Sequence, residues 1–189
     1  MSDYNKFQEY YEEYMPRIFG YVYNRVGFNR ALAEDIVSEV FLKALEKFDL
    51  YSEEKGTFKS WIFRVTKNHM IDHFKAKKNK PKADLDKLSN ILPDKSNVEK
   101  DTGREMEKEK LLEAMSNLSE QKKELISLRY FSGYSYKEMA EILNSDEAKM
   151  RVQVFRTLKS LKGTLFELNY SNEDGKTGQK NRSTTQRPR

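Results

Sequence analysis

Residues 135–162 form the stretch SYKEMAEILNSDEAKMRVQVFRTLKSLK, whose pattern decides the fold of the C-terminal part of the chain. Ser135 and Glu138 match the capping box that opens a helix, and Asp146 is placed to cap a second helix. Asn144, in the turn between them, tolerates left-handed backbone geometry. A short helix, a tight turn and a second helix together predict a helix-turn-helix.

The second helix of this motif is predicted to have an inward apolar seam, made by Met150, Val154 and Leu158 at four-residue spacing. When a helix-turn-helix binds duplex DNA, the early residues of this helix meet base edges and phosphates in the major groove. An ordinary αα-hairpin with a solvated basic face is the alternative interpretation. The candidate DNA contacts on the outward face are Lys149, Arg151, Val152, Gln153, Phe155 and Arg156.

Apolar residues at three- and four-residue spacing also predict three helices near the N-terminus. Pro16 lies inside the first of them and predicts a break or kink there. Short connections between the three helices predict one small all-α module. The predicted helices span residues 4–27, about 30–48 after a cap at Asn29, and about 57–75.

Positive charge and aromatic rings are interleaved between Lys55 and Lys82, where nine lysine or arginine residues accompany a single acid, Asp72. Basic side chains can follow a phosphate backbone, and exposed aromatic rings can stack on unpaired bases. We predict nucleic-acid contact for the segment as a whole, although each aromatic residue taken singly is better explained as core. The candidate contacts within it are Lys59, Trp61, Arg64 and Lys67.

An acidic edge is predicted on the second helix, at Glu34, Asp35, Ser38 and Glu39. Acidic residues beside apolar positions suit docking to a basic helical partner. Glu39 also lies four residues before Lys43, so a helical ion pair explains its position equally well.

The 189-residue chain is 37% hydrophobic and 34% charged, with a net charge of +5 and no cysteine. This composition favours small helical modules joined by a polar linker, and it excludes disulfide scaffolds and thiol catalysis. We therefore expect an all-α protein with two small domains. The expected parts are a three-helix module at 4–76, a flexible linker at 77–107, a helix-turn-helix module at 108–168 and a disordered basic tail at 169–189.

The sequence contains no phosphate-binding loop, Ser-His-Asp arrangement or zinc signature. His69 and His73 have i, i+4 spacing but lack the adjacent glutamate of a metalloprotease helix. We expect no enzyme, and hence no catalytic residue, metal, cofactor or small-molecule substrate. No apolar run approaches the roughly 18–20 residues of a membrane span, and the N-terminus lacks a signal-peptide pattern. We therefore expect a cytoplasmic protein without membrane insertion.

Three stretches resemble bacterial RNA polymerase sigma factors of the two-domain, sigma-70-like extracytoplasmic-function type. Residues 33–44 (AEDIVSEVFLKA) resemble the polymerase-docking helix of that family. Residues 58–72, beginning FKSWIFRVTKN, resemble its promoter-melting segment, and residues 118–143, from LSEQ to GYSYKEMAEIL, resemble its C-terminal domain. The matches occur in the family's order and together cover about residues 5–168.

The resemblance implies a sigma factor that binds core RNA polymerase and directs it to promoter DNA. It implies docking through Asp35, Ser38 and Glu39, where Ser38 replaces the usual glutamine. Relatives are often held inactive by an anti-sigma protein, which the resemblance makes an expected partner here.

The resemblance also implies two contacts with promoter DNA. The last helix would meet the upstream element, and the melted non-template strand would be captured at the N-terminal module. Phe48 and Asn68 match residues that line the pocket for a flipped base, and the loop at 49–56 would set which base is accepted. Lys149, Val152 and Gln153 depart from the commoner residues, so the promoter sequence cannot be inferred from a relative.

Two other classes of protein are compatible with parts of the sequence. A stand-alone helix-turn-helix regulator would explain residues 108–168 but would leave the Lys55–Lys82 segment without a role. A helical adaptor that docks proteins alone is disfavoured by the basic and aromatic residues of the same segment.

Overall fold

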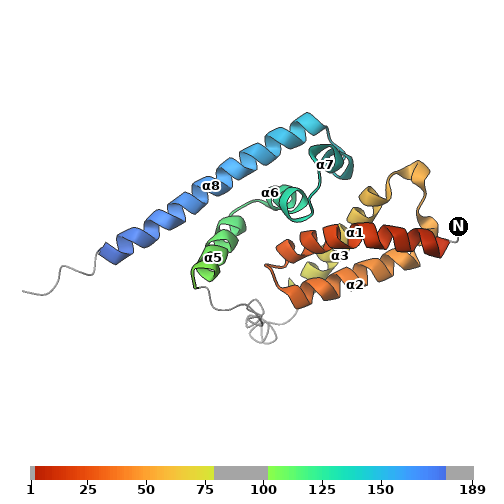
Figure 1. Ribbon diagram of the computed structural model, residues 1–189, viewed down its shortest axis with the longest axis horizontal. Helices are drawn as coiled ribbons and strands as arrows, with labels where there is room; N and C mark the ends of the chain where they lie inside the picture. Colours follow the sequence, from red (N-terminus) through yellow and green to blue (C-terminus); the bar gives the residue numbers. More distant parts are fainter. Residues whose placement is uncertain (1–2, 79–101, 178–189) are drawn as a thin grey trace, which may run out of the picture.

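The computed structural model describes residues 3–78 and 102–177, which are helical apart from short connections (Figure 1). This confirms the predicted all-α fold. The N-terminal module consists of α1 (Asp3–Arg25), α2 (Arg30–Glu46), the 3-10 turns η1 (Phe48–Leu50) and η2 (Glu53–Lys55), and α3 (Phe58–Lys78). The C-terminal module consists of α5 (Thr102–Ser116), α6 (Glu120–Ile126), the π-helical turn η3 (Ser127–Phe131), α7 (Tyr136–Ile142) and α8 (Glu147–Thr177).

The three helices of the N-terminal module pack around a common core because each has an apolar stripe at helical spacing. Ile18 on α1, Val40 on α2 and Ile62 on α3 are completely buried. Near η1 the core becomes aromatic, and the ring of Tyr10 stacks on that of Phe58 with centroids 4.0 Å apart. Packing of this core determines which faces of α2 and α3 are exposed to solvent.

Pro16 does not break α1, which is continuous from Asp3 to Arg25. Of the break or kink predicted at this position, the break is therefore wrong. A proline inside a helix removes one backbone hydrogen bond. The buried residues on both sides of it, Phe7 and Ile18, anchor the two halves of α1 to the same core.

The helix-turn-helix forms with the predicted caps. The Ser135 hydroxyl accepts a hydrogen bond from the Glu138 backbone N–H, and a Glu138 carboxylate oxygen accepts one from the Ser135 N–H at 2.8 Å. Asp146 accepts a hydrogen bond from the Lys149 N–H at 2.7 Å, which caps α8. Asn144 has the left-handed φ of 49° that the turn requires. These local bonds position α8 relative to α7.

The ends of the helices differ from the expected domain boundaries. Helix α3 continues to Lys78, inside the linker expected at 77–107, and α5 begins at Thr102, before the expected boundary at 108. Helix α8 continues to Thr177, past the expected end at 168. Extending an existing helix by one residue costs much less free energy than starting a new helix. The helices therefore continue beyond the residues that show an apolar periodicity. The rest of the expected linker and tail lies outside the described residues.

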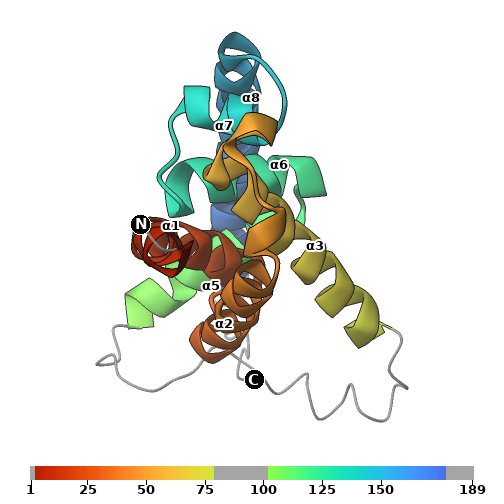
Figure 2. The same cartoon turned by 90° about the vertical axis from the view of Figure 1, so that its right-hand side faces the viewer.

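The two modules pack against each other. Leu128, Tyr134 and Met139 of the C-terminal module belong to the same buried cluster as Ile18 and Ile62 of the N-terminal module. The contacts join α1 to η3 and α3 to α7, and Figure 2 shows α6 and α7 lying over α1 and α3. Among the described helices, none has a stretch long and apolar enough for a transmembrane segment.

Candidate nucleic-acid interface

Helix α8 presents the predicted outward face to solvent. Met150 and Val154 are buried, as the predicted seam requires. Val152 and Phe155 are 47% and 68% exposed, so both are accessible for contact with thymine methyl groups. Of the six candidates, Lys149, Arg151, Val152, Phe155 and Arg156 are exposed, and Gln153 is half-buried.

Arg151 is held in position by two neighbours on its own module. Its guanidinium lies 2.8 Å from the Glu147 carboxylate, one turn earlier on α8. It also lies over the ring of Tyr136, 5.2 Å from the centroid. The ion pair is exposed and therefore weak, so the guanidinium can exchange Glu147 for a guanine edge or a phosphate.

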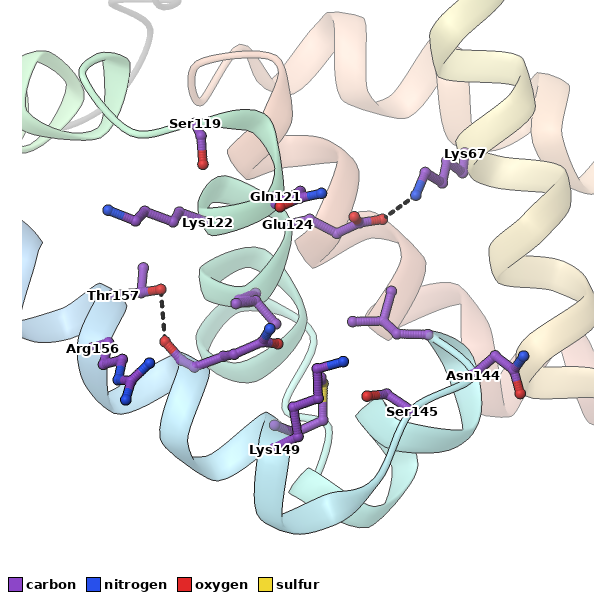
Figure 3. Close-up of a pocket in the computed structure, with 14 residues that line it drawn as sticks. Lys67, Ser119, Gln121, Lys122, Glu124, Asn144, Ser145, Lys149, Arg156 and Thr157 are labelled. Carbon is purple, nitrogen blue, oxygen red and sulfur yellow. Dashed lines mark hydrogen bonds and ion pairs between the residues drawn. The ribbon is translucent and has the colours of Figure 1, made fainter.

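A cleft of about 510 Å³ lies between α6, the turn before α8 and α8 itself, and Lys67 of the N-terminal module lies at its edge (Figure 3). Lys149 and Arg156 of α8 line it from one side, and Lys67 of α3 contributes from the other. The close-up shows Lys67 paired with Glu124 of α6, at 2.8 Å. Residues predicted to contact duplex DNA and a residue predicted to contact melted DNA therefore line the same cleft.

The candidates on α3 differ in their exposure. Arg64 and Asn68 are exposed, whereas Trp61 is partly buried against Tyr51, with ring centroids 5.4 Å apart. The side chain of Lys59 is only 11% exposed, because it is enclosed by residues of α7. The exposure of Lys59 expected for a strand contact is therefore not found in this arrangement.

Phe48 and Asn68 do not meet in the expected pocket. Phe48 is 9% exposed and lines a cleft of about 470 Å³ with the acidic residues Asp49, Glu53 and Glu54. Asn68 is not part of that wall. The residue of α3 that packs against Phe48 is Phe58. Asn68 lies ten residues after Phe58, which is about 15 Å along the helix at 1.5 Å per residue. The 49–56 loop does line the cleft, through Asp49, Tyr51 and Ser52 among others.

The candidate docking residues Asp35, Ser38 and Glu39 all lie on the exposed face of α2. Sequence patterns missed that Leu42 continues this face and is 58% exposed. Leu45, which the pattern assigns to the buried stripe, is 42% exposed, because it lies three residues after Leu42 and shares its face of the helix. We call Asp35, Ser38, Glu39, Leu42 and Leu45 the α2 edge. It combines acidic and apolar side chains, as a docking surface does.

Glu39 and Lys43 do not pair with each other but flank His69 of α3. The Nζ of Lys43 donates to Nδ1 of His69 at 2.7 Å, and Oε2 of Glu39 lies 3.1 Å from Nε2. His69 is 7% exposed. Burial, and after it the charge of Lys43, lowers the pKa of His69 below its ordinary value. His69 is therefore a structural link between α2 and α3.

This link predicts a pH-dependent stability. The unfolded chain protonates His69 near pH 6.5, whereas the folded chain resists protonation until a lower pH. The free energy of unfolding should therefore fall as the pH drops from 7.5 to 5.5, by at most about 1.4 kcal/mol per pH unit from this residue. Urea titrations at each pH should show that the free energy of unfolding depends less on pH in His69→Gln than in the wild type. An equal pH dependence in the two proteins would contradict the assignment.

Comparisons with known proteins find relatives for both modules. Family models for Sigma-70 region 2 and for Sigma-70, region 4 match residues 10–80 and 108–161. The ECF RNA polymerase sigma factor BldN of Streptomyces coelicolor is 26% identical over 155 residues, which cover 82% of this chain and 58% of BldN. The ECF sigma factor SigM of Bacillus subtilis is 28% identical over 155 residues, which cover 82% of this chain and 91% of SigM.

Solved structures share the fold. The sigma factor RpoE of Bartonella quintana, in complex with the anti-sigma factor NepR, matches with a TM-score of 0.57 and 20% identity, over 85% of this chain and 96% of that one. CnrH, in complex with the cytosolic domain of CnrY, matches with a TM-score of 0.56 and 17% identity, over 85% and 88%.

The chain belongs to the sigma-70 family. Within that family it is a sigma factor of the two-domain extracytoplasmic-function (ECF) type, with region 2 in its N-terminal module and region 4 in its C-terminal module. Sigma factors are transcription initiation factors rather than enzymes, and ECF relatives support polymerase binding and promoter-directed transcription as the general role.

Proposed function

We propose that the chain binds core RNA polymerase and places it at specific promoters through two separate DNA contacts. In this proposal residues 4–76 and 108–168 act as two domains joined by the linker at 77–107, and the polymerase performs nucleotidyl transfer. The observation that carries the proposal is the presence of exposed basic side chains on both α8 and α3, in the two modules of a sigma-70 chain.

Docking to the polymerase uses the α2 edge. Its carboxylates, Asp35 and Glu39, suit a basic surface of the partner, and Leu42 supplies an apolar contact at the centre. Interfaces commonly combine a small apolar centre with a polar rim.

Recognition of the upstream element uses the exposed face of α8. Arg151 and Arg156 can each bind a guanine through O6 and N7, Gln153 can pair with adenine, and Val152 and Phe155 can contact thymine methyl groups. Lys149 lies at the start of the helix, where phosphate contacts fix the register without reading sequence.

Capture of the melted strand uses the basic face of α3 and the 49–56 loop. Lys59, Arg64 and Lys67 bind phosphates, Asn68 hydrogen-bonds to the strand, and Trp61 supports the aromatic wall near Phe48. Extruding a base costs a few kcal/mol, which a shaped pocket must offset. Because Phe48 and Asn68 are separated here, such a pocket must form as the strand binds.

An anti-sigma protein is a further proposed partner, because RpoE and CnrH are each described in a complex with a partner protein, named an anti-sigma factor in the case of RpoE. The proposed place of action is the cytoplasm, where the polymerase and the promoters are found.

The proposal is tested by adding the purified chain to core polymerase and mapping run-off transcripts from a promoter library. We expect a stable complex with core polymerase and transcripts that begin at a defined set of promoters. A chain that neither binds core polymerase nor changes the start sites would overturn the proposal. Specific duplex binding without core polymerase would instead favour a stand-alone regulator.

The role of α8 yields a separate prediction. Arg156→Ala should reduce discrimination at one position of the upstream element by about 1–3 kcal/mol, the usual value of a bidentate contact to guanine. The matched control is Lys159→Ala, which removes an equal charge from an exposed position of the same helix. Transcription from libraries randomised in the upstream element measures both. Equal losses in the two variants would show that Arg156 contributes charge alone.

A further inference from the structure

His69 of α3 lies at the contact between α3 and the α2 edge. Its side chain is 7% exposed, whereas the side chain of Glu39 against it is 61% exposed. The Lys43 Nζ lies 2.7 Å from Nδ1 of the ring, and the Glu39 Oε2 lies 3.1 Å from Nε2. One buried ring of α3 therefore contacts two charged side chains that are one turn apart on α2.

The Lys43 ammonium determines which nitrogen of the ring has the proton. An ammonium group has hydrogen-bond donors and no acceptor, so Nδ1 of His69 must accept from it and has no hydrogen of its own. Burial and the charge of Lys43 lower the pKa of His69, which keeps the ring neutral near pH 7. In the neutral ring the single proton is then on Nε2, the nitrogen that lies against Glu39.

The Nε2 atom needs the Glu39 carboxylate. It is buried, and no other described residue accepts a hydrogen bond from it. A buried N–H without an acceptor is costly, so the ring favours the side-chain conformations of Glu39 that keep Oε2 close. A carboxylate has two oxygens, and the exposure of Glu39 leaves the second one accessible to a partner. The ring thus restrains Glu39 without covering it.

We propose that His69 is a positioning residue for polymerase docking, which holds the Glu39 carboxylate in the orientation that meets a basic group of core polymerase. His69 is too deeply buried to contact the polymerase itself. Lys43 contributes by keeping the proton of the ring on Nε2. Restraining a long side chain before binding reduces the entropy that is lost when the complex forms. This inference rests on the proposed docking through the α2 edge.

Substitutions of His69 in the full chain can separate Nε2 from the rest of the ring. Glutamine can place its amide N–H near the position of Nε2 and still donate to Glu39. Asparagine is shorter and reaches only the position of Nδ1, and leucine fills the site without any donor. We expect His69→Leu and His69→Asn to weaken binding to core polymerase about three- to tenfold, as for one side chain that must be ordered on binding. His69→Gln should bind with nearly the wild-type affinity.

The matched control is His73→Leu, which removes the same ring one turn further along α3. His73 is half-buried and its ring lies against Phe74 of the same helix, with centroids 5.8 Å apart. This variant should bind core polymerase like the wild type. Urea titration of every variant shows whether a loss of affinity accompanies a loss of stability. If His69→Leu does not fold, the comparison of His69→Asn with His69→Gln takes its place.

A double-variant cycle distinguishes positioning of Glu39 from general support of α2. Glu39→Ala alone should weaken binding, and His69→Leu should weaken it no further in the Glu39→Ala background, because the carboxylate through which His69 acts is gone. A role limited to holding α2 against α3 would instead give the same loss in both backgrounds.

The outcomes separate this inference from the docking proposal. If Glu39→Ala binds core polymerase with wild-type affinity, Glu39 has no docking role and the inference falls with it. If Glu39→Ala weakens binding but the loss from His69→Leu is the same in both backgrounds, docking through Glu39 stands and the positioning role of His69 is overturned. Tighter binding by His69→Leu would also overturn it, because the ring would then compete with the polymerase for the carboxylate.

Discussion

Gly20→Ala is expected to separate the two modules while leaving each of them folded. A Cβ at this position would lie 1.9 Å from the carbonyl oxygen of Phe131 and 2.7 Å from its carbon. Both are backbone atoms of η3, which cannot rotate away as the end of a side chain can. Within α1, however, alanine is a better helix former than glycine by about 1 kcal/mol. The substitution should therefore strengthen α1 and disrupt its contact with η3.

Energy transfer between dyes on α1 and α8 would measure this effect. We expect Gly20→Ala to show low transfer even at low salt, with helical circular dichroism at least equal to that of the wild type. Gly163→Ala is the matched control, because Gly163 lies in α8 and an added Cβ there meets no atom within 4 Å. Retention of high transfer by Gly20→Ala would mean that η3 adjusts to the methyl group. Loss of helicity would mean that the modules depend on each other to fold.

Leu42→Ser is expected to weaken binding to core polymerase by at least about 30-fold, or roughly 2 kcal/mol, as for a residue at the centre of an interface. Leu42 is 58% exposed and lies one turn beyond Ser38 on the α2 edge. Since it is not part of the buried core, the substitution should leave the free energy of unfolding nearly unchanged. Loss of affinity would then report the docking contact itself.

Met106→Ser provides the comparison, because Met106 is 54% exposed and lies on α5, away from the α2 edge. Titration of labelled chain with core polymerase should show wild-type affinity for this control. If Leu42→Ser also binds with wild-type affinity, docking does not use the α2 edge as proposed. A fall in unfolding free energy would show instead that Leu42 supports the fold.

The local patterns predicted the helices and their caps well. The Ser135–Glu138 capping box, the Asp146 cap and the left-handed Asn144 all formed, because each depends on residues within four positions of one another. Phe48 and Asn68 were harder to place. The resemblance gave their roles, but their separation depends on how α3 packs against η1, which no local spacing reports.

The charge pattern of the sequence did not predict which cations are paired within the folded chain. Between Lys55 and Lys82 the sequence has nine basic residues and one acid, and this excess predicted a nucleic-acid partner. In the structure Lys59 and Lys67 are neutralised by glutamates more than 50 residues later in the chain. The residues whose charge could have revealed this are the glutamates of α6 and α7, which lie far from α3 in the sequence.

The sequence by itself determined the all-α class, the helix-turn-helix and the sigma-70 type of this protein, because caps, helical periodicity and motifs act over short distances along the chain. Only the tertiary structure decided that the two modules pack against each other and that Lys59 is covered by α7. It also decided that η3 approaches α1 at Gly20, where a side chain would not fit. Those features arise from shape and charge complementarity between surfaces distant in sequence, and such complementarity exists only once the helices have been placed.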